Sequence, residues 1–86
     1  MKKTKQKLPK WFDGVLYEKG ETVTNPYSGE ECKLTAEEIS MYDFIKGAEM
    51  CISAGMNVNG KIHDDFNKGL RWFMRANPKA YMVLLD

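Results

Sequence analysis

Residues 35–55, TAEEISMYDFIKGAEMCISAG, decide the fold because they carry a complete set of helix signals. Thr35 and Glu38 have the spacing of a capping box, in which each side chain accepts a hydrogen bond from a backbone N–H at the helix start. Gly55 stands where a helix commonly ends on a left-handed residue. Apolar residues between them recur at spacings of three and four and form one stripe: Met41, Phe44, Ile45, Ala48, Cys51 and Ile52. The sequence therefore predicts an amphipathic helix that must bury one face.

A second helix is predicted over residues 62–76, after a loop that contains Asn and Gly. Its inner stripe has helical spacing and consists of Ile62, Phe66, Gly69, Leu70 and Phe73. Charged residues fall largely outside this stripe: Asp64, Asp65, Lys68, Arg71 and Arg75. Gly47 and Gly69 lie inside the two helices, where glycine is about 1 kcal/mol less favourable than alanine. We interpret both glycines as points where the helices approach closely.

Short β-strands are predicted ahead of the first helix. Residues 15–18 and 22–24 have strand character and flank a Lys-Gly-Glu turn, so they predict a β-hairpin. Residues 25–29, Asn-Pro-Tyr-Ser-Gly, form a second turn, after which residues 31–34 extend the hairpin to a meander. At the other end of the chain, Asn77 and Pro78 favour a short C-terminal helix, although the apolar residues that follow also suit a strand.

Together these elements predict an α+β fold, in which an N-terminal β-hairpin or three-stranded meander packs on two main helices and a short C-terminal helix. The 86 residues suffice for one domain, with residues 1–8 as a lysine-rich flexible tail and residues 9–86 as the folded part. A chain of this length buries only about 60–65% of its unfolded surface. Because its core is thin, a homodimer that completes the core is one of the states that the sequence permits.

Charge is unevenly distributed along the chain. Five of the 13 basic residues stand in the first ten positions, and the remaining 76 residues carry 8 basic and 12 acidic side chains. An acidic body therefore follows a basic tail. Cys32 and Cys51 have no CxxC spacing, and no apolar run follows the lysines as a signal peptide requires. We expect free thiols, no membrane segment and a cytoplasmic location.

The sequence contains no motif that indicates catalysis. His63, the only histidine, precedes Asp64 and Asp65, but consecutive residues on a helix point in different directions and do not converge on a metal ion or a proton. Phosphate-binding glycine loops, HExxH and EF-hand spacings are missing. The chain is therefore predicted not to be an enzyme and to need no cofactor or metal.

Aromatic residues provide the strongest indication of binding. Tyr and Trp dominate interface hot spots, and this chain has more of them than a small core can enclose. Acidic residues line the polar side of the first helix, where they form a solvated face or a docking surface for a basic partner: Glu37, Glu38, Asp43 and Glu49. Our first hypothesis is protein–protein binding, with these partner-binding residues: Trp11, Trp72, Tyr42, Glu37 and Glu49.

A second hypothesis is an accessory protein that contacts nucleic acid weakly through phosphates. Its candidate residues are the lysines of the tail and two arginines on one outer face of the second helix: Lys2, Lys3, Lys5, Lys7, Lys10, Arg71 and Arg75. Against it, the body is acidic, and the loop between the helices is longer than in a helix-turn-helix. A third alternative is a minor component of a virion.

Three stretches carry a resemblance to a known group: LPKWFDGVLYEKGETVTNPYSGE at residues 8–30, LTAEEISMYDFIKGAEM at 34–50 and KGLRWFMRANPKAYMVLLD at 68–86. Together they resemble small proteins encoded by tailed phages of marine bacteria, including cyanophages. The group has no assigned activity, so the resemblance transfers no catalytic residue or cofactor. It implies a phage product that works in the cytoplasm of a bacterial host by binding a host or phage protein.

Overall fold

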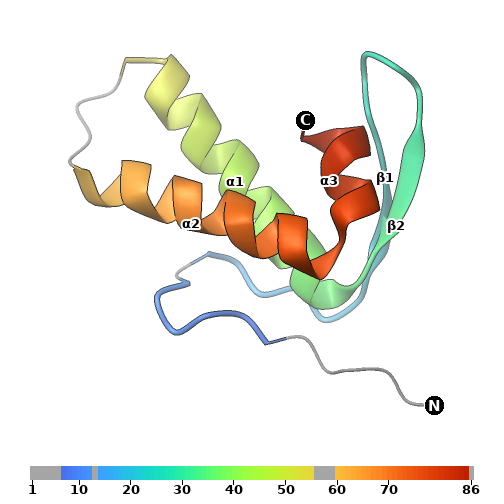
Figure 1. Ribbon diagram of the computed structural model, residues 1–86, viewed down its shortest axis with the longest axis horizontal. Helices are drawn as coiled ribbons and strands as arrows, with labels where there is room; N and C mark the ends of the chain where they lie inside the picture. The colour runs from blue at the N-terminus through green and yellow to red at the C-terminus, as the bar shows by residue number, and fades with distance from the viewer. Residues whose placement is uncertain (1–6, 13, 56–59, 86) are drawn as a thin grey trace.

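Two strands and three helices make up the fold in this computed structural model, which describes residues 7–12, 14–55 and 60–85. In chain order they are β1 (Glu21–Thr24), β2 (Glu31–Leu34), α1 (Ala36–Ser53), α2 (Gly60–Ala76) and α3 (Pro78–Leu84). Figure 1 shows α1 and α2 packed along each other, with α3 between this helix pair and the hairpin. The predicted α+β fold is confirmed, including the short C-terminal helix.

The hairpin is formed by the second and third predicted strands. β1 and β2 are antiparallel, with Glu21 opposite Leu34 and Thr24 opposite Glu31. Residues 15–18 form no strand, so the predicted pairing of these residues with residues 22–24 is wrong. The backbone N–H of Tyr17 instead donates to the Ser40 hydroxyl of α1 over 2.9 Å, which ties this segment to a helix.

The two main helices meet at Gly69. A Cβ atom built on Gly69 would lie 3.2 Å from both Ile45 Cγ1 and Met41 Sδ, so the close approach predicted here is confirmed. At Gly47 the prediction is wrong, because a Cβ there would meet no atom within 4 Å. The core around this contact consists of Leu34, Ile39, Met41, Ile45, Phe73, Ala80 and Leu84.

The burial of Asp65 shows that α2 is rotated differently from the prediction. It was expected outside the inner stripe, yet only 7% of it is exposed. Close packing at Gly69 turns the row of residues 65, 69 and 73 toward the interior, because residues four apart lie above one another on a helix. The Lys61 amine compensates the Asp65 carboxylate at 2.6 Å, so this acid is buried as one half of an ion pair.

A hydrogen-bonded junction joins the start of α1 to the start of α3. The predicted capping box forms, with the Glu38 N–H donating to the Thr35 hydroxyl and the Thr35 N–H donating to Glu38 Oε1. Glu38 was also predicted on a solvated acidic face, which is wrong because it is buried. Its carboxylate accepts a further hydrogen bond from Asn77 Nδ2 at 3.2 Å, and Asn77 Oδ1 accepts one from the Ala80 N–H and so caps α3.

The turn of the hairpin is tied to the other end of α3. Asn25 Nδ2 donates to the Val83 carbonyl over 2.6 Å, while Asn25 Oδ1 accepts from the Tyr27 N–H at 2.7 Å and shapes the turn. Gly29 closes the turn with a φ of 80°, a conformation that favours glycine. The predicted turn is confirmed, and α3 is held at both ends by asparagine side chains.

We predict that Asn77→Ala lowers the free energy of unfolding by about 1–3 kcal/mol. The substitution removes the cap of α3 and takes one donor from the buried Glu38 carboxylate. Urea denaturation followed by circular dichroism measures the change. Asn67→Ala, at an exposed position of α2, is the matched control and should shift stability by no more than about 0.5 kcal/mol. Equal effects of the two substitutions would contradict the junction's role.

Substitutions at the two helical glycines should change the stability of the protein in opposite directions. Gly47→Ala is expected to stabilise the protein by about 0.5–1 kcal/mol, because alanine favours the helix and the site is open. Gly69→Val should destabilise it by about 1–3 kcal/mol, since the added atoms press on Met41 and Ile45. Thermal and urea unfolding of the two variants test both signs. Stabilisation by Gly69→Val would show that the helices do not need this contact.

Candidate functional site

A pocket of about 410 Å³ lies between α2 and the N-terminal segment, and we call it the Trp11–Trp72 pocket. Five of its lining residues stand at positions 68, 71, 72, 75 and 76 of α2, and such spacing places them on neighbouring rows of one helix. Residues 7, 9 and 11 close the pocket from the N-terminal segment, which runs beneath α2 in Figure 1. The complete lining is Lys7, Pro9, Trp11, Lys68, Arg71, Trp72, Arg75 and Ala76.

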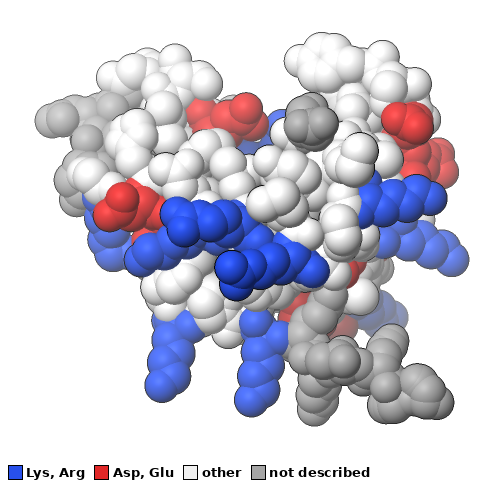
Figure 2. All heavy atoms as spheres, viewed as in Figure 1, with Lys and Arg blue, Asp and Glu red and all other residues white. Residues whose placement is uncertain are grey.

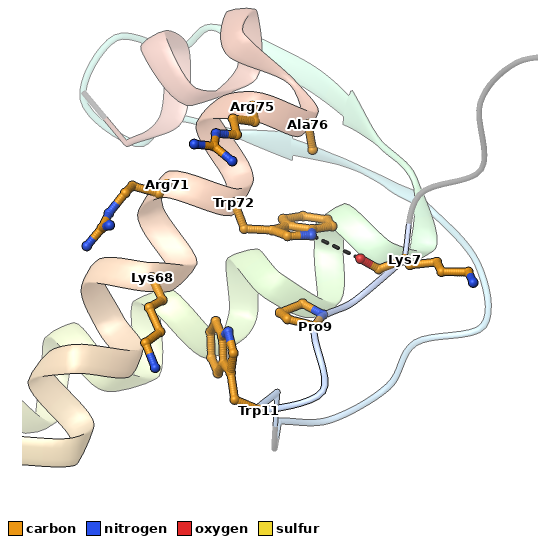
Figure 3. Close-up of a pocket in the computed structure, with 8 residues that line it drawn as sticks. All are labelled: Lys7, Pro9, Trp11, Lys68, Arg71, Trp72, Arg75 and Ala76. Carbon is orange, nitrogen blue, oxygen red and sulfur yellow. Dashed lines mark hydrogen bonds between the residues drawn. The ribbon is translucent and has the colours of Figure 1, made fainter.

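A hydrogen bond from Trp72 connects the N-terminal segment to α2. Its indole N–H donates to the Lys7 carbonyl over 3.0 Å, as the dashed line in Figure 3 shows, while the Lys7 amine points away from the ring. Leu8 packs against the core. Residues 7 and 8 of the predicted tail therefore contact the domain, whereas residues 1–6 lie outside the described residues.

Trp11 forms another wall of the pocket and is backed by phenylalanines. Its ring centroid lies 5.7 Å from that of Phe44 and 6.5 Å from that of Phe12. Lys68 reaches from α2 toward the same indole, with Nζ 5.9 Å from the ring centroid, a cation–π distance. Both indoles are half-buried. Each is thus held by the domain while part of it remains accessible from the pocket.

The charges of the pocket have one sign. Lys68, Arg71 and Arg75 line it, and none of its lining residues is acidic. These three side chains make no ion pair within residues 7–12, 14–55 and 60–85. Figure 2 shows basic side chains gathered over the C-terminal half of α2. The pocket can therefore attract an anion, and flat apolar surfaces are available beside the charges.

The remaining predicted partner-binding residues lie elsewhere. Tyr42 packs on Phe73 with ring centroids 6.2 Å apart, and it lines a smaller hollow of about 220 Å³ together with Glu49. Glu49 is exposed and pairs with Lys46 at 3.1 Å. Glu37 is half-buried in the first turn of α1 and lines neither hollow. The structure thus brings together Trp11 and Trp72 but separates them from the other three.

Of the residues proposed to contact nucleic acid, only some line the pocket. Lys7, Arg71 and Arg75 line the Trp11–Trp72 pocket, while the exposed Lys10 does not. Lys2, Lys3 and Lys5 lie outside the described residues. Three lining residues were not predicted from the sequence as site residues: Pro9, Lys68 and Ala76. Lys68 precedes Arg71, Trp72 and Arg75 by helical spacings, a signal that was available, whereas the position of Pro9 depends on how the N-terminal segment folds back.

Other candidate groups do not converge. Cys32 and Cys51 are free and half-buried, so the buried position expected for Cys51 is only partly reached. In the described part of the chain, no three His, Cys, Asp or Glu side chains are grouped so that they could hold a metal ion. The helices within that part include none with both the length and the apolar character that crossing a membrane requires.

Comparison of the chain with models of protein families, with curated proteins and with solved structures found no match in any of the three.

We predict that Trp72→Phe loosens the N-terminal segment, because phenylalanine keeps a ring but cannot donate to the Lys7 carbonyl. Loss of one such hydrogen bond, about 0.5–1.5 kcal/mol, should speed trypsin cleavage after Lys7 and Lys10 by roughly 2- to 12-fold. Mass spectrometry of timed digests measures the rates. Cleavage after Lys33, in β2, is the internal control and should not change. A parallel rise at Lys33 would mean that the whole domain has been weakened.

Proposed function

We propose that this protein is a non-enzymatic binding protein, and that the Trp11–Trp72 pocket recognises a negatively charged segment of a macromolecular partner. The observation that carries the proposal is the presence of Lys68, Arg71 and Arg75 around two half-buried indoles without an acidic neighbour in the pocket lining. These cations make no ion pair among the described residues, so no carboxylate there offsets their attraction for an external anion.

The aromatic residues support a specific contact in place of diffuse attraction. Trp and Arg are the residues most enriched at binding hot spots, where an apolar anchor excludes water from neighbouring polar contacts. Trp72 is fixed by its hydrogen bond to Lys7, and Trp11 is fixed by its packing on Phe44. A partner that binds here meets side chains already held in place, which lowers the entropy that binding must overcome.

From the resemblance to proteins of marine tailed phages, we propose further that the protein works inside a bacterial host. In that setting the partner belongs to the bacterial host or to the phage itself, and the protein acts on it by occupying a surface. By sequence, three further lysines stand within the six residues that precede Lys7, and they add positive charge close to the pocket along the chain.

Substitutions that remove positive charge from the pocket test the proposal. Arg71→Gln with Arg75→Gln should lower the salt concentration at which the protein elutes from a heparin column, because two pocket cations are lost. Lys33→Gln with Lys79→Gln is the matched control: it removes the same charge from exposed positions that do not line the pocket. This control is expected to elute close to the wild type.

Two outcomes would overturn the proposal. Identical elution of the two double variants would mean that net charge alone determines retention, and that the pocket has no part in it. Failure of the wild-type protein to bind heparin at low salt would show that the pocket does not attract polyanions. Circular dichroism of each variant verifies that the fold is intact.

A further inference from the structure

We infer that the Trp11–Trp72 pocket binds single-stranded nucleic acid, with a base stacked against an indole and phosphates held by the cations of α2. This inference rests on the proposed function and names the class of anion. Interfaces between proteins are enriched in arginine and aromatic residues but depleted of lysine, whereas surfaces that bind nucleic acid are much more positively charged. With four basic residues, two indoles and no acid in its lining, the pocket has the second composition.

The arrangement of the cations fits a charged polymer. Lys68, Arg71 and Arg75 are spaced by three and four residues, so they extend over roughly 10 Å of the α2 axis at about 1.5 Å per residue. Such a row can contact successive phosphates of a strand. The planar guanidinium groups of the two arginines can also bind a phosphate through two parallel hydrogen bonds.

The state of the Trp72 indole favours stacking. Its N–H is already bonded to the Lys7 carbonyl, so the ring needs no further polar partner and offers its apolar surface to a ligand. Every base has a flat π face that can stack on such a ring, which is how proteins bind single strands without reading their sequence. An acidic peptide would account for the cations but would not require flat surfaces beside them.

The position of the charges relative to the rings favours a single strand over a duplex as the ligand. Figure 3 shows Trp72, Pro9 and Trp11 together between α2 and the N-terminal segment, while Arg71 and Arg75 extend outward from α2. A base would therefore enter the pocket while its phosphates remain at the edge. In a duplex the bases are stacked on one another and cannot enter. The volume of about 410 Å³ lies within the range of pockets that enclose small organic groups.

Intrinsic fluorescence gives a direct test, since the two tryptophans of the chain both line this pocket. We would titrate the full-length protein with oligo-deoxythymidylate, with oligo-uridylate, with a mixed-sequence DNA duplex, with heparin and with a polyglutamate peptide. Either single strand should quench the fluorescence in a saturable way and bind more tightly than the duplex. The two single-stranded arms then tell DNA from RNA. Heparin and polyglutamate, which lack bases, should not give this quenching.

Variants separate stacking from charge, with affinity measured by the anisotropy of a labelled oligonucleotide. Trp72→Leu should weaken single-strand binding by roughly 5- to 150-fold, the contribution of one stacked base, whereas Trp72→Phe should remain within a few-fold of the wild type because it keeps a ring. Arg71→Gln with Arg75→Gln should reduce the slope of log affinity against log salt by about 1.4, which corresponds to two phosphate contacts. Should Trp72→Leu fail to fold, the quenching of the wild-type protein and its preference for single strands over the duplex still decide.

Several results would overturn the inference. Equal affinity for duplex and single strand, or unchanged binding by a folded Trp72→Leu variant, would exclude stacking. Binding of polyglutamate at least as tightly as the oligonucleotides would assign the pocket to an acidic protein segment. In each of these cases the proposed function stands if heparin retention still depends on Arg71 and Arg75. Loss of that dependence alone would remove the proposed function.

Discussion

The buried carboxylate of Glu38 is the constraint on which the rest of the structure depends. An ionisable side chain that is 3% exposed requires hydrogen-bond donors, since a buried polar group without them is strongly unfavourable. One donor is the backbone of Thr35, which the capping box supplies locally, and another is the side chain of Asn77, 39 residues away. Burial of Glu38 therefore fixes where the chain turns from α2 into α3.

The position of α3 follows from that junction. Asn77 caps α3 with one side-chain atom while it donates to Glu38 with another, so the helix cannot begin elsewhere without loss of both bonds. Asn25 then holds the far end of α3 through the Val83 carbonyl. A two-stranded hairpin is marginal by itself in water. Here it is stabilised because α3 connects its turn to the helix pair.

One side of α2 packs against the core, and another lines the Trp11–Trp72 pocket. The row of Asp65, Gly69 and Phe73 is buried against the rest of the domain, and the close contact at Gly69 determines how the helix is rotated. The same rotation presents Lys68, Arg71 and Trp72 to the N-terminal segment. Packing of the core and formation of the pocket are thus two consequences of one helix orientation. Basic charge concentrates here although the chain as a whole is nearly neutral.

The sequence by itself determined the elements whose signals are local. The capping box at Thr35, the left-handed Gly55, the turn at residues 25–29 and the Asn77 cap of α3 all involve residues within a few positions of one another, and each was predicted. The helical spacing of Arg71, Trp72 and Arg75 likewise placed these residues close together on α2.

Only the tertiary structure decided which strands pair, which helical row is buried and which aromatic residues meet. Residues 15–18 have strand character, but Tyr17 bonds to α1 instead, and Asp65 is polar but lies inside because Gly69 sets the rotation of α2. Trp11 and Trp72 are 61 positions apart, and no local pattern joins them to one pocket. The physical reason is the same in each case: competing local preferences are small, and long-range packing and hydrogen bonding choose between them.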